Sequence, residues 1–291
     1  MKVIENVLTS GFSTLGVGGF ARGYLEMDNK SQWGHVLNLI SKGNPCEEFF
    51  ILGGGSNSVF GDFYDGIIIK LKGEFCDIKA TGTGYICGGG VNLHKVCNLA
   101  RKDGLSGLCE LLGIFGTVGG GVFGNCGAFG REISDVVEWV EVLTKTGEMR
   151  ISKSLCGFCY RKSSLPKNSI ITRVKFNLEK STKFQLEKIT NACKIARISS
   201  QPFSEKSCGS TYKKIGEISP AKLIDMAGLK GYRVGGLEVS KKHAGFIVNI
   251  GGGTPCDFQK ITREIEDIIF EKYQIKIEKE IKFIGYNNKI Q

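Results

Sequence analysis

The uncharged stretch LLGIFGTVGGGVFGNCGAFG, residues 111–130, limits the possible fold more than any other part of the sequence. Twenty residues without a charge are long enough to cross a bilayer as a helix. Eight of the twenty are glycine, however, and each glycine destabilises a helix by about 1 kcal/mol relative to alanine. We therefore expect a buried glycine-rich loop here and no membrane span.

Glycine is abundant throughout, with 41 residues among 291, against a usual share of roughly 7%. The glycines cluster in GGGSN (53–57), CGGG (87–90) and GGGT (251–254) as well, without a collagen-like repeat. Such clusters occur where the backbone approaches a neighbour closely or turns through positive φ. The loop LGGGSNSVF (52–60) is either a structural turn or a nest of amides for an anion. Together with 111–130, it would suit a long ligand with a central pyrophosphate, with two ligand-free turns as the alternative.

The chain length of 291 residues predicts two or three domains. Its eleven cysteines are odd in number and mostly embedded in apolar runs. The N-terminal segment MKVIENVLTSGF lacks the apolar core of a signal peptide. Free thiols in a reducing cytoplasm fit this pattern better than a disulfide framework, so we expect a cytoplasmic protein.

Positive charge is concentrated in the second half of the chain. Residues 1–145 contain 12 Lys and Arg against 15 Asp and Glu, a net charge of −3. Residues 146–291 contain 27 against 14, a net charge of +13. Such a half is typical of proteins that bind an anion, and either a nucleic acid or a phosphorylated small substrate would fit. From the charge alone, a surface whose positive residues merely keep the protein soluble is an equally good explanation of this excess.

The apolar pattern predicts an α+β chain with a boundary near residues 179–190 and no internal repeat. Buried apolar runs or alternating residues predict strands and hairpins at 48–52, 66–71, 136–151, 171–178 and 276–285. Apolar residues at helical spacing predict helices at 92–103, 184–198 and 254–273. The expected buried faces of these helices are Leu93, Val96, Cys97 and Ala100; Leu186, Ile189, Cys193 and Ala196; and Phe258, Ile261, Ile265 and Ile268.

Thr254 is the expected N-cap of the last helix. Pro255 suits the first helical position, and Asp257 follows the cap at the third position, where an acidic residue is favourable.

The C-x-x-C pair formed by Cys156 and Cys159 suggests redox or zinc chemistry. A zinc site would need a second pair or suitably spaced histidines, and His35, His94 and His243 are far apart in the sequence. A thioredoxin-like motif would need a surrounding βαβ pattern, which is missing. We therefore interpret the two cysteines as bystanders and expect no metal site.

Seven stretches, in order along nearly the whole chain, carry a resemblance to one enzyme family. They are STLGVGGFA (13–21), ILGGGSNSVFGDFYDGIIIKL (51–71), GLSGLCELLGIFGTVGGGVFGNCGAFGREI (104–133), FCYRKSSL (158–165), QPFSEKSCGSTYKKIG (201–216), AKLIDMAGLKGYRVGGLEVSKKHAGFIVN (221–249) and EKEIKFIG (278–285). Each is weak alone, but the ordered set is specific. The chain resembles UDP-N-acetylenolpyruvoylglucosamine reductase, also called UDP-N-acetylmuramate dehydrogenase.

The resemblance implies an α+β fold with an FAD-binding region of the vanillyl-alcohol-oxidase type and a C-terminal α+β substrate-binding domain. It implies one FAD subdomain at 1–72, joined by 274–291, a second at 73–180, and the substrate domain at 181–273. NADPH would reduce FAD, which is expected to be non-covalent because ILGGGSNSVF has no histidine for attachment. The reduced flavin would pass hydride to the enolpyruvyl C3 of UDP-N-acetylglucosamine enolpyruvate. The product, UDP-N-acetylmuramate, would serve peptidoglycan synthesis and hence cell shape and division.

Three residues match the family's catalytic set. Arg161, in CYRKS, would bind the substrate carboxylate and stabilise the enolate, a role that suits a planar guanidinium. Ser210, in CGST, would donate the proton to C2. Glu280, in EKEIKF, would help to stabilise the same intermediate, which requires it to be protonated or hydrogen-bonded near the enolate.

The resemblance also implies the residues that would contact the cofactor and the substrate. Those for FAD are Gly53, Gly54, Gly55, Ser56, Asn57, Gly116, Thr117, Gly119, Gly120, Asn125, Gly127 and Ala128. Those for the UDP substrate are Tyr160, Lys213, Lys214, Arg233 and His243. The sequence departs from the family in GSTYKKIG, where G-S-x-F-x-N/R-P is common, and at Phe129, where tyrosine is common. These departures leave individual UDP contacts open.

The short segment between FNL (176–178) and QPF (201–203) resembles the subtype that lacks an extra tyrosine-bearing loop. The main alternative is another FAD-linked oxidoreductase on the same fold. A basic nucleic-acid-binding protein is more distant, because the aromatic residues lie mostly in apolar runs. We expect a monomer that binds neither nucleic acid nor membrane.

Overall fold

The structure is a computed structural model that describes residues 2–43 and 48–285. The chain forms two compact units. Unit 1 consists of Tyr24–Gly54 and Gly66–Ala196 with the first residues of the chain, and unit 2 of Ile4–Gly23, Gly55–Asp65 and Arg197 onwards. The functional division expected at residues 72, 180 and 273 stays a prediction.

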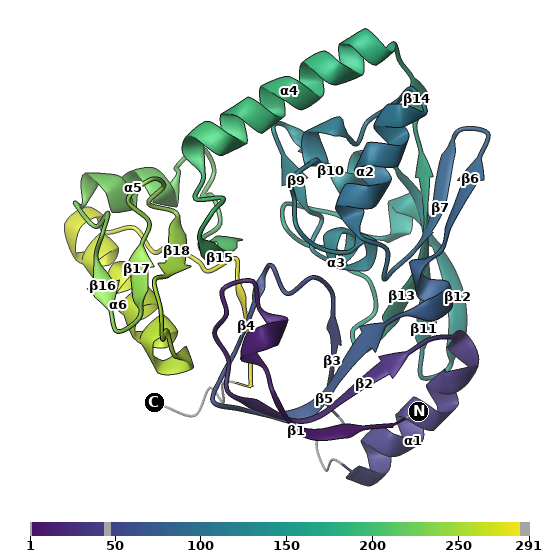
Figure 1. Ribbon diagram of the computed structural model, residues 1–291, viewed down its shortest axis with the longest axis horizontal. Helices are drawn as coiled ribbons and strands as arrows, with labels where there is room; N and C mark the ends of the chain where they lie inside the picture. Colours follow the sequence, from purple (N-terminus) through teal and green to yellow (C-terminus); the bar gives the residue numbers. More distant parts are fainter. Residues whose placement is uncertain (1, 44–47, 286–291) are drawn as a thin grey trace. The chain divides into compact units, whose positions relative to one another are not determined.

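A five-stranded antiparallel sheet, in the order β12-β11-β13-β7-β6, is the frame of unit 1 (Figure 1). Its strands are β6 (Ile78–Thr81), β7 (Gly84–Gly88), β11 (Val137–Thr144), β12 (Gly147–Ser152) and β13 (Ile170–Asn177). β11 and β12 form the expected hairpin. Val174 and Phe176 are buried while Arg173 is exposed, so the alternation predicted for this strand is confirmed.

Helices α2 (Leu93–Lys102) and α3 (Val118–Phe123) share one apolar core with this sheet. All four residues of the face predicted for α2 are buried. The side chain of Asn92 caps α2 by accepting a hydrogen bond of 3.1 Å from the Lys95 N–H. Part of this core therefore forms on the helix and strands that periodicity predicts, whereas β7 and α3, which also contribute to it, were not predicted.

The strands predicted at 48–52 and 66–71 are confirmed as β3 (Phe49–Leu52) and β5 (Phe63–Leu71), which pair in parallel. They belong to a sheet in the order β1-β2-β5-β3, with β1 (Ile4–Leu8) and β2 (Phe20–Met27). The remaining elements within unit 1 are α1 (Trp33–Gly43), β8 (Leu105–Ser106), β9 (Gly127–Ala128), β10 (Arg131–Glu132) and β14 (Glu179–Lys180).

The glycine-rich stretch 111–130 is, as expected, a loop, which the six-residue helix α3 interrupts. It is buried only in part, because Phe115, Phe123 and Phe129 are exposed. The hydroxyl of Thr117 caps α3 by accepting a hydrogen bond of 3.2 Å from the Gly120 N–H. Across the described residues, no helix combines the length and the apolar character that a membrane crossing requires.

Unit 2 contains a four-stranded sheet in the order β15-β18-β17-β16 and a parallel pair, β4 with β19. The strands are β4 (Ser58–Phe60), β15 (Lys206–Ser210), β16 (Arg233–Val234), β17 (Leu237–Val239), β18 (Phe246–Asn249) and β19 (Lys282–Ile284). Helices α5 (Pro220–Met226) and α6 (Pro255–Tyr273) pack on them around a second apolar core. Helix α4 (Lys183–Ser200) begins in unit 1 and ends in unit 2.

The start of α6 is confirmed, because Thr254 and Asp257 bond to each other's N–H groups in a capping box. The predicted face needs one correction: Ile269 is fully buried, whereas Ile268 is only partly buried. The helical period of 3.6 places both residues near the apolar stripe, and packing selects one of them.

The strand expected at 276–285 is regular only at Lys282–Ile284. The residues before it pair through a single bridge between Tyr212 and Lys279. The strand length predicted from the alternation of apolar and polar residues was therefore too long, because only part of the segment has a neighbouring strand to pair with.

Candidate active site

Arg161 occupies the tip of a tight turn in unit 1. Cys159 and Lys162 exchange two main-chain hydrogen bonds, of 3.0 and 3.1 Å, with Tyr160 and Arg161 between them. Arg161 has φ +56°, in the left-handed region that glycine and asparagine adopt at low cost. A non-glycine residue held there costs of order 1–3 kcal/mol and is found where function or packing requires it.

The side chain of Arg161 is held against the glycine-rich stretch. Its guanidinium donates a hydrogen bond of 2.9 Å to the main-chain O of Gly127 and lies 4.9 Å from the ring centre of Tyr160. A Cβ added at Gly127 would come within 2.6 Å of the main-chain O of Arg131. The same Cβ would lie 3.2 Å from the Arg161 guanidinium, so glycine at 127 leaves room both for the main chain of Arg131 and for Arg161.

Asn125 is a buried hub between the glycine stretch and the arginine turn. Its Nδ2 donates to Glu132 Oε2 at 2.6 Å and to the main-chain O of Cys159 at 3.0 Å. Its Oδ1 accepts a hydrogen bond of 3.2 Å from the Ser134 N–H. The amide is therefore satisfied on both sides, which supports a positioning role for Asn125 rather than an open contact to a ligand.

The glycine loop around residue 53 packs backbone to backbone on the loop at residue 116 within unit 1. A Cβ at Gly54 would lie 2.6 Å from the Cα of Gly116, and one at Gly53 would lie 3.0 Å from the hydroxyl of Thr117. The Lys70 ammonium donates to the main-chain O of Gly53, and burial lowers the pKa of that lysine. In this glycine cradle, formed by the loops at 53–57 and 116–128, Gly53 and Gly54 thus have a packing reason, and their contact with a cofactor stays a prediction.

The amides at the start of α3 are used inside the protein. Val118, Gly119 and Gly120 donate to Val91 O, Gly89 O and the Thr117 hydroxyl. A Cβ at Gly119 would also lie 2.9 Å from Gly89 O. Glycine at these positions thus has a packing reason of its own, and direct contact of Gly119 and Gly120 with a cofactor stays a prediction.

Ser210 ends strand β15 in unit 2, directly after Gly209, which has φ +77°. It pairs with Phe246 in the neighbouring strand β18. Its exposed hydroxyl donates a long hydrogen bond of 3.4 Å to the main-chain O of Tyr212. Because this bond is long, it holds the serine proton only weakly.

Glu280 lies on the segment that pairs with the residues after Ser210. The Glu280 N–H donates to Thr211 O at 2.8 Å, and the amide of Asn57 donates to Glu280 O at 3.3 Å. Asn57 O in turn accepts a hydrogen bond of 3.0 Å from the Lys282 N–H. Three predicted residues, Asn57, Ser210 and Glu280, are thereby brought together in unit 2. Arg161 belongs to unit 1.

The predicted substrate residues of unit 2 differ in their surroundings. Lys213 forms an ion pair with Glu278, and Arg233 forms one with the buried carboxylate of Glu238. Lys214 is exposed. The exposed side chains of Lys214 and Arg233 suit an anionic ligand. Glu278 and Glu238, however, already pair with Lys213 and Arg233 and would compete with such a ligand for their positive charge.

His243 is half-buried and is oriented by its own turn. Its Nδ1 accepts a hydrogen bond of 3.1 Å from the Gly245 N–H, and its ring centre is 4.9 Å from that of Phe246. Burial lowers the pKa of His243, and the positive charge of Lys230 lowers it further, against the opposing effects of a main-chain hydrogen bond and Asp225. The lowered pKa favours the neutral imidazole, whose Nδ1 accepts a hydrogen bond from the backbone.

The C-x-x-C pair has the features of two unrelated thiols. Cys156 is buried, its thiol donates to Ser152 O at 3.3 Å, and burial raises its pKa. Cys159 is exposed, and both cysteines are free, like every other cysteine in the described part of the chain. Within residues 2–43 and 48–285, no cluster of three or more His, Cys, Asp or Glu is arranged to hold a metal ion.

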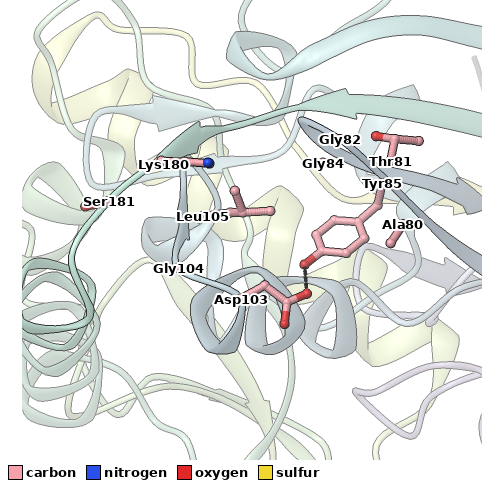
Figure 2. A pocket seen from close by; sticks show the side chains of 10 residues that line it. All are labelled: Ala80, Thr81, Gly82, Gly84, Tyr85, Asp103, Gly104, Leu105, Lys180 and Ser181. Atoms are coloured by element: carbon pink, nitrogen blue, oxygen red, sulfur yellow. Dashed lines mark hydrogen bonds between the residues drawn. The ribbon is translucent and has the colours of Figure 1, made fainter.

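A pocket of about 370 Å³ lies at the β6–β7 end of unit 1 (Figure 2). The Tyr85 hydroxyl projects from β7 and donates a hydrogen bond to Asp103 after α2, with Lys180 at the rim. None of the residues predicted for cofactor, substrate or catalysis lines this pocket, so it is separate from the candidate site.

Two residues that support the site were missed at the level of sequence. Glu132 holds the amide of Asn125, and Lys70 holds the main chain of Gly53. Lys70 had a signal, since it is the one charge that interrupts the apolar run GIIIKL. Glu132 had none, because its partner is identified only by the fold.

Comparison with known proteins agrees with this arrangement. The family model for the C-terminal domain of UDP-N-acetylenolpyruvoylglucosamine reductase matches residues 201–284, and that for an FAD-binding domain matches residues 34–152. The second match contains the glycine cradle, and the first contains Ser210 and Glu280.

Whole-chain relatives extend both matches. UDP-N-acetylenolpyruvoylglucosamine reductase 2 of Bacillus cereus is 35% identical over 272 residues, covering 92% of this chain and 88% of the relative. The Shouchella clausii reductase is 38% identical over 238 residues, covering 81% and 76%. A crystal structure of the reductase from Thermus caldophilus superposes with a TM-score of 0.85 at 33% identity, covering 98% of this chain and 99% of that one. The chain therefore belongs to the UDP-N-acetylenolpyruvoylglucosamine reductase family.

Proposed function

We infer that this chain is an FAD-dependent oxidoreductase that uses NADPH to convert UDP-N-acetylglucosamine enolpyruvate into UDP-N-acetylmuramate, a step of peptidoglycan synthesis. Family membership supports this activity, because the similarity covers both the FAD-binding region and the C-terminal domain. The observation that carries the inference is the main-chain pairing of Thr211 with Glu280, which makes Ser210 and Glu280 neighbours in unit 2. Ser210, a potential proton donor, and the carboxylate of Glu280 thus occupy the positions that match the family's motifs.

The glycine loops at 53–57 and 116–128 are proposed to hold FAD without a covalent bond. Their close backbone packing fits a cofactor whose pyrophosphate lies against main chain. When bound, FAD supplies hydride transfer from NADPH to C3 of the enolpyruvyl group. The protein's own task is to hold the substrate and to deliver the proton at C2.

Ser210 is proposed as the proton donor. A serine hydroxyl is a weak acid, so it can protonate only a carbon on which negative charge develops. Glu280 and Arg161 are proposed to stabilise that charge, with the planar guanidinium of Arg161 binding the substrate carboxylate. The turn that fixes Arg161, with its bond to Gly127 O, supports this role because it orients the guanidinium in advance.

We also propose that the protein acts as a monomer in the cytoplasm. The cysteines of the described residues are all free, which fits a reducing compartment. Tyr160, Lys213, Lys214, Arg233 and His243 remain candidates for contact with the UDP substrate. Of these, Lys213 and Lys214 carry charge close in sequence to Ser210.

The test is to follow the two half-reactions separately by flavin absorbance. NADPH should reduce the bound FAD, and the enolpyruvyl substrate should then reoxidise it with formation of UDP-N-acetylmuramate. Ser210→Ala should leave the first step unchanged and slow the second by about 10²- to 10⁴-fold.

Two results would count against the assignment. A protein that cannot be reconstituted with FAD would contradict it outright. A flavoprotein that NADPH reduces but the enolpyruvyl substrate does not reoxidise would favour another oxidoreductase on the same fold.

A further inference from the structure

The two segments that carry Ser210 and Glu280 are joined by a short antiparallel ladder. Tyr212 and Lys279 face each other in its middle. On either side, the Glu280 N–H donates to Thr211 O at 2.8 Å, and the Lys213 N–H donates to Glu278 O at 2.9 Å. The spacing between Ser210 and Glu280 therefore depends on how this ladder is held.

Both residues in the middle of the ladder attach to the same turn of helix α6. Tyr212 is 4% exposed, and its hydroxyl donates a hydrogen bond of 3.0 Å to the main-chain O of Thr262. Lys279 forms an ion pair with Glu266, which lies one helical turn after Thr262. Two independent anchors thus tie the ladder to one helix.

Glu266 is central to this attachment. Its Oε1 atom is buried, and the ammonium of Lys279 is its ion-pair partner. Burial raises the pKa of Tyr212 well above its ordinary value, and the charge of Glu266 raises it further. The carboxylate of Glu266 therefore interacts electrostatically with both Lys279 and Tyr212.

A surface ion pair in this position would contribute little. The side chains of Lys279 and Glu266 are each only 28% exposed, so the pair is shielded from solvent. Removing one partner of a shielded pair leaves the other charge uncompensated, which has a larger effect than removing an exposed pair.

We propose that Glu266 is a positioning residue for proton transfer, because its ion pair with Lys279 holds the ladder that sets the spacing of Ser210 and Glu280. Tyr212 supplies a second anchor to α6 through the bond of its hydroxyl to Thr262 O. The proposal rests on the proposed function, since it concerns the step in which Ser210 and Glu280 act.

The experiment compares Glu266→Gln with Glu264→Gln in the FAD-loaded enzyme. Glu264 is a matched control on the same helix, because it accepts a hydrogen bond of 2.8 Å from the Tyr232 hydroxyl but does not contact the ladder. Glu266→Gln should slow reoxidation of the flavin by the enolpyruvyl substrate about 10- to 100-fold, since small displacements of reacting groups cost up to about that much. Reduction by NADPH should stay within about twofold of the wild type, and Glu264→Gln should change neither step.

A double-mutant cycle adds a second criterion. If Glu266 acts through Lys279, the variant Glu266→Gln/Lys279→Met should be no slower than the worse single variant. Should Glu266→Gln not fold, the charge-neutral double variant Glu266→Gln/Lys279→Met decides the matter, because it removes the ion pair without leaving an uncompensated charge. It should slow reoxidation several-fold with an unchanged reduction step.

The proposal is overturned if Glu266→Gln matches Glu264→Gln, if it slows both half-reactions alike, or if the two effects in the cycle simply multiply. An unchanged reoxidation rate in the double variant Glu266→Gln/Lys279→Met would have the same consequence. Failure of the proposed function would be distinct, because the wild-type enzyme itself would then not be reoxidised by the substrate.

Discussion

The guanidinium of Arg161 donates a 2.9 Å hydrogen bond to the main-chain O of Gly127, although Arg161 itself has φ +56°. A side chain with a proposed catalytic role is thus presented from a backbone conformation that favours glycine. The backbone conformation at position 161 favours glycine, whereas the proposed catalytic role requires arginine. Substitutions at this position can separate the effect on stability from the effect on activity.

Arg161→Gly and Arg161→Ala are expected to lose activity equally and to differ in stability. Alanine keeps the unfavourable left-handed conformation, whereas glycine relieves it, so the glycine variant should be more stable by about 1 kcal/mol. Denaturant unfolding measures the difference in stability, and turnover with NADPH and the enolpyruvyl substrate measures activity. As a control, alanine at both Cys156 and Cys159 should leave turnover largely intact. High activity in Arg161→Gly would remove this residue from the mechanism.

Gly54→Ala is expected to weaken FAD binding at least about tenfold. The added Cβ would lie 2.6 Å from the Cα of Gly116, so the two glycine loops would have to separate. The flavin content of the purified protein and an FAD titration of the apoprotein measure the effect. Gly82→Ala is the matched control, because a Cβ there meets nothing within 4 Å. Equal FAD binding by both variants would show that the loop packing does not shape the cofactor site.

Ionic strength is expected to affect the UDP substrate more than the flavin. Residues 146–291 carry a net charge of +13, and exposed charges are screened beyond roughly 10 Å at about 0.1 M salt. The KM for the enolpyruvyl substrate should therefore rise steeply with salt while FAD stays bound. A flat KM would show that the basic half does not attract this ligand.

His243 is expected to make the protein less stable in mild acid. Burial lowers its pKa in the folded state, so between that pKa and the ordinary value of about 6.5 the unfolded chain binds more protons. Stability is therefore full above about pH 6.5 and falls as the pH is lowered through that range. Thermal unfolding from pH 5.5 to 7.5, as a rough span, measures this dependence.

The control for this experiment is His35→Gln, which removes an exposed imidazole from α1. His243→Gln should flatten the pH dependence, whereas His35→Gln should retain it. If both variants keep the wild-type dependence, His243 is not its source.

Periodicity predicted the parts of the fold that are decided locally. The buried face of α2 and the cap of α6 follow from spacing and from capping chemistry at Thr254. The bond of the Arg161 guanidinium to Gly127 O could not be predicted, because the two residues are more than thirty positions apart in the sequence. The same holds for Glu266, an ordinary helical glutamate in the sequence whose partner Lys279 is identified only by the tertiary pairing.

Strands β2 and β5 each begin in unit 2 and end in unit 1, and α4 joins the units in the opposite direction. This arrangement limits how the chain can be divided into fragments or recombined with a relative. A fragment that starts at Arg197 would lack β4, the parallel partner of β19 next to Glu280. A single genetic recombination point between the genes of two relatives would likewise assemble unit 2 from segments of both proteins. Unit 2 therefore cannot be transferred as one continuous segment of the chain, and it can diversify by point substitution and loop insertion far more readily than by exchange.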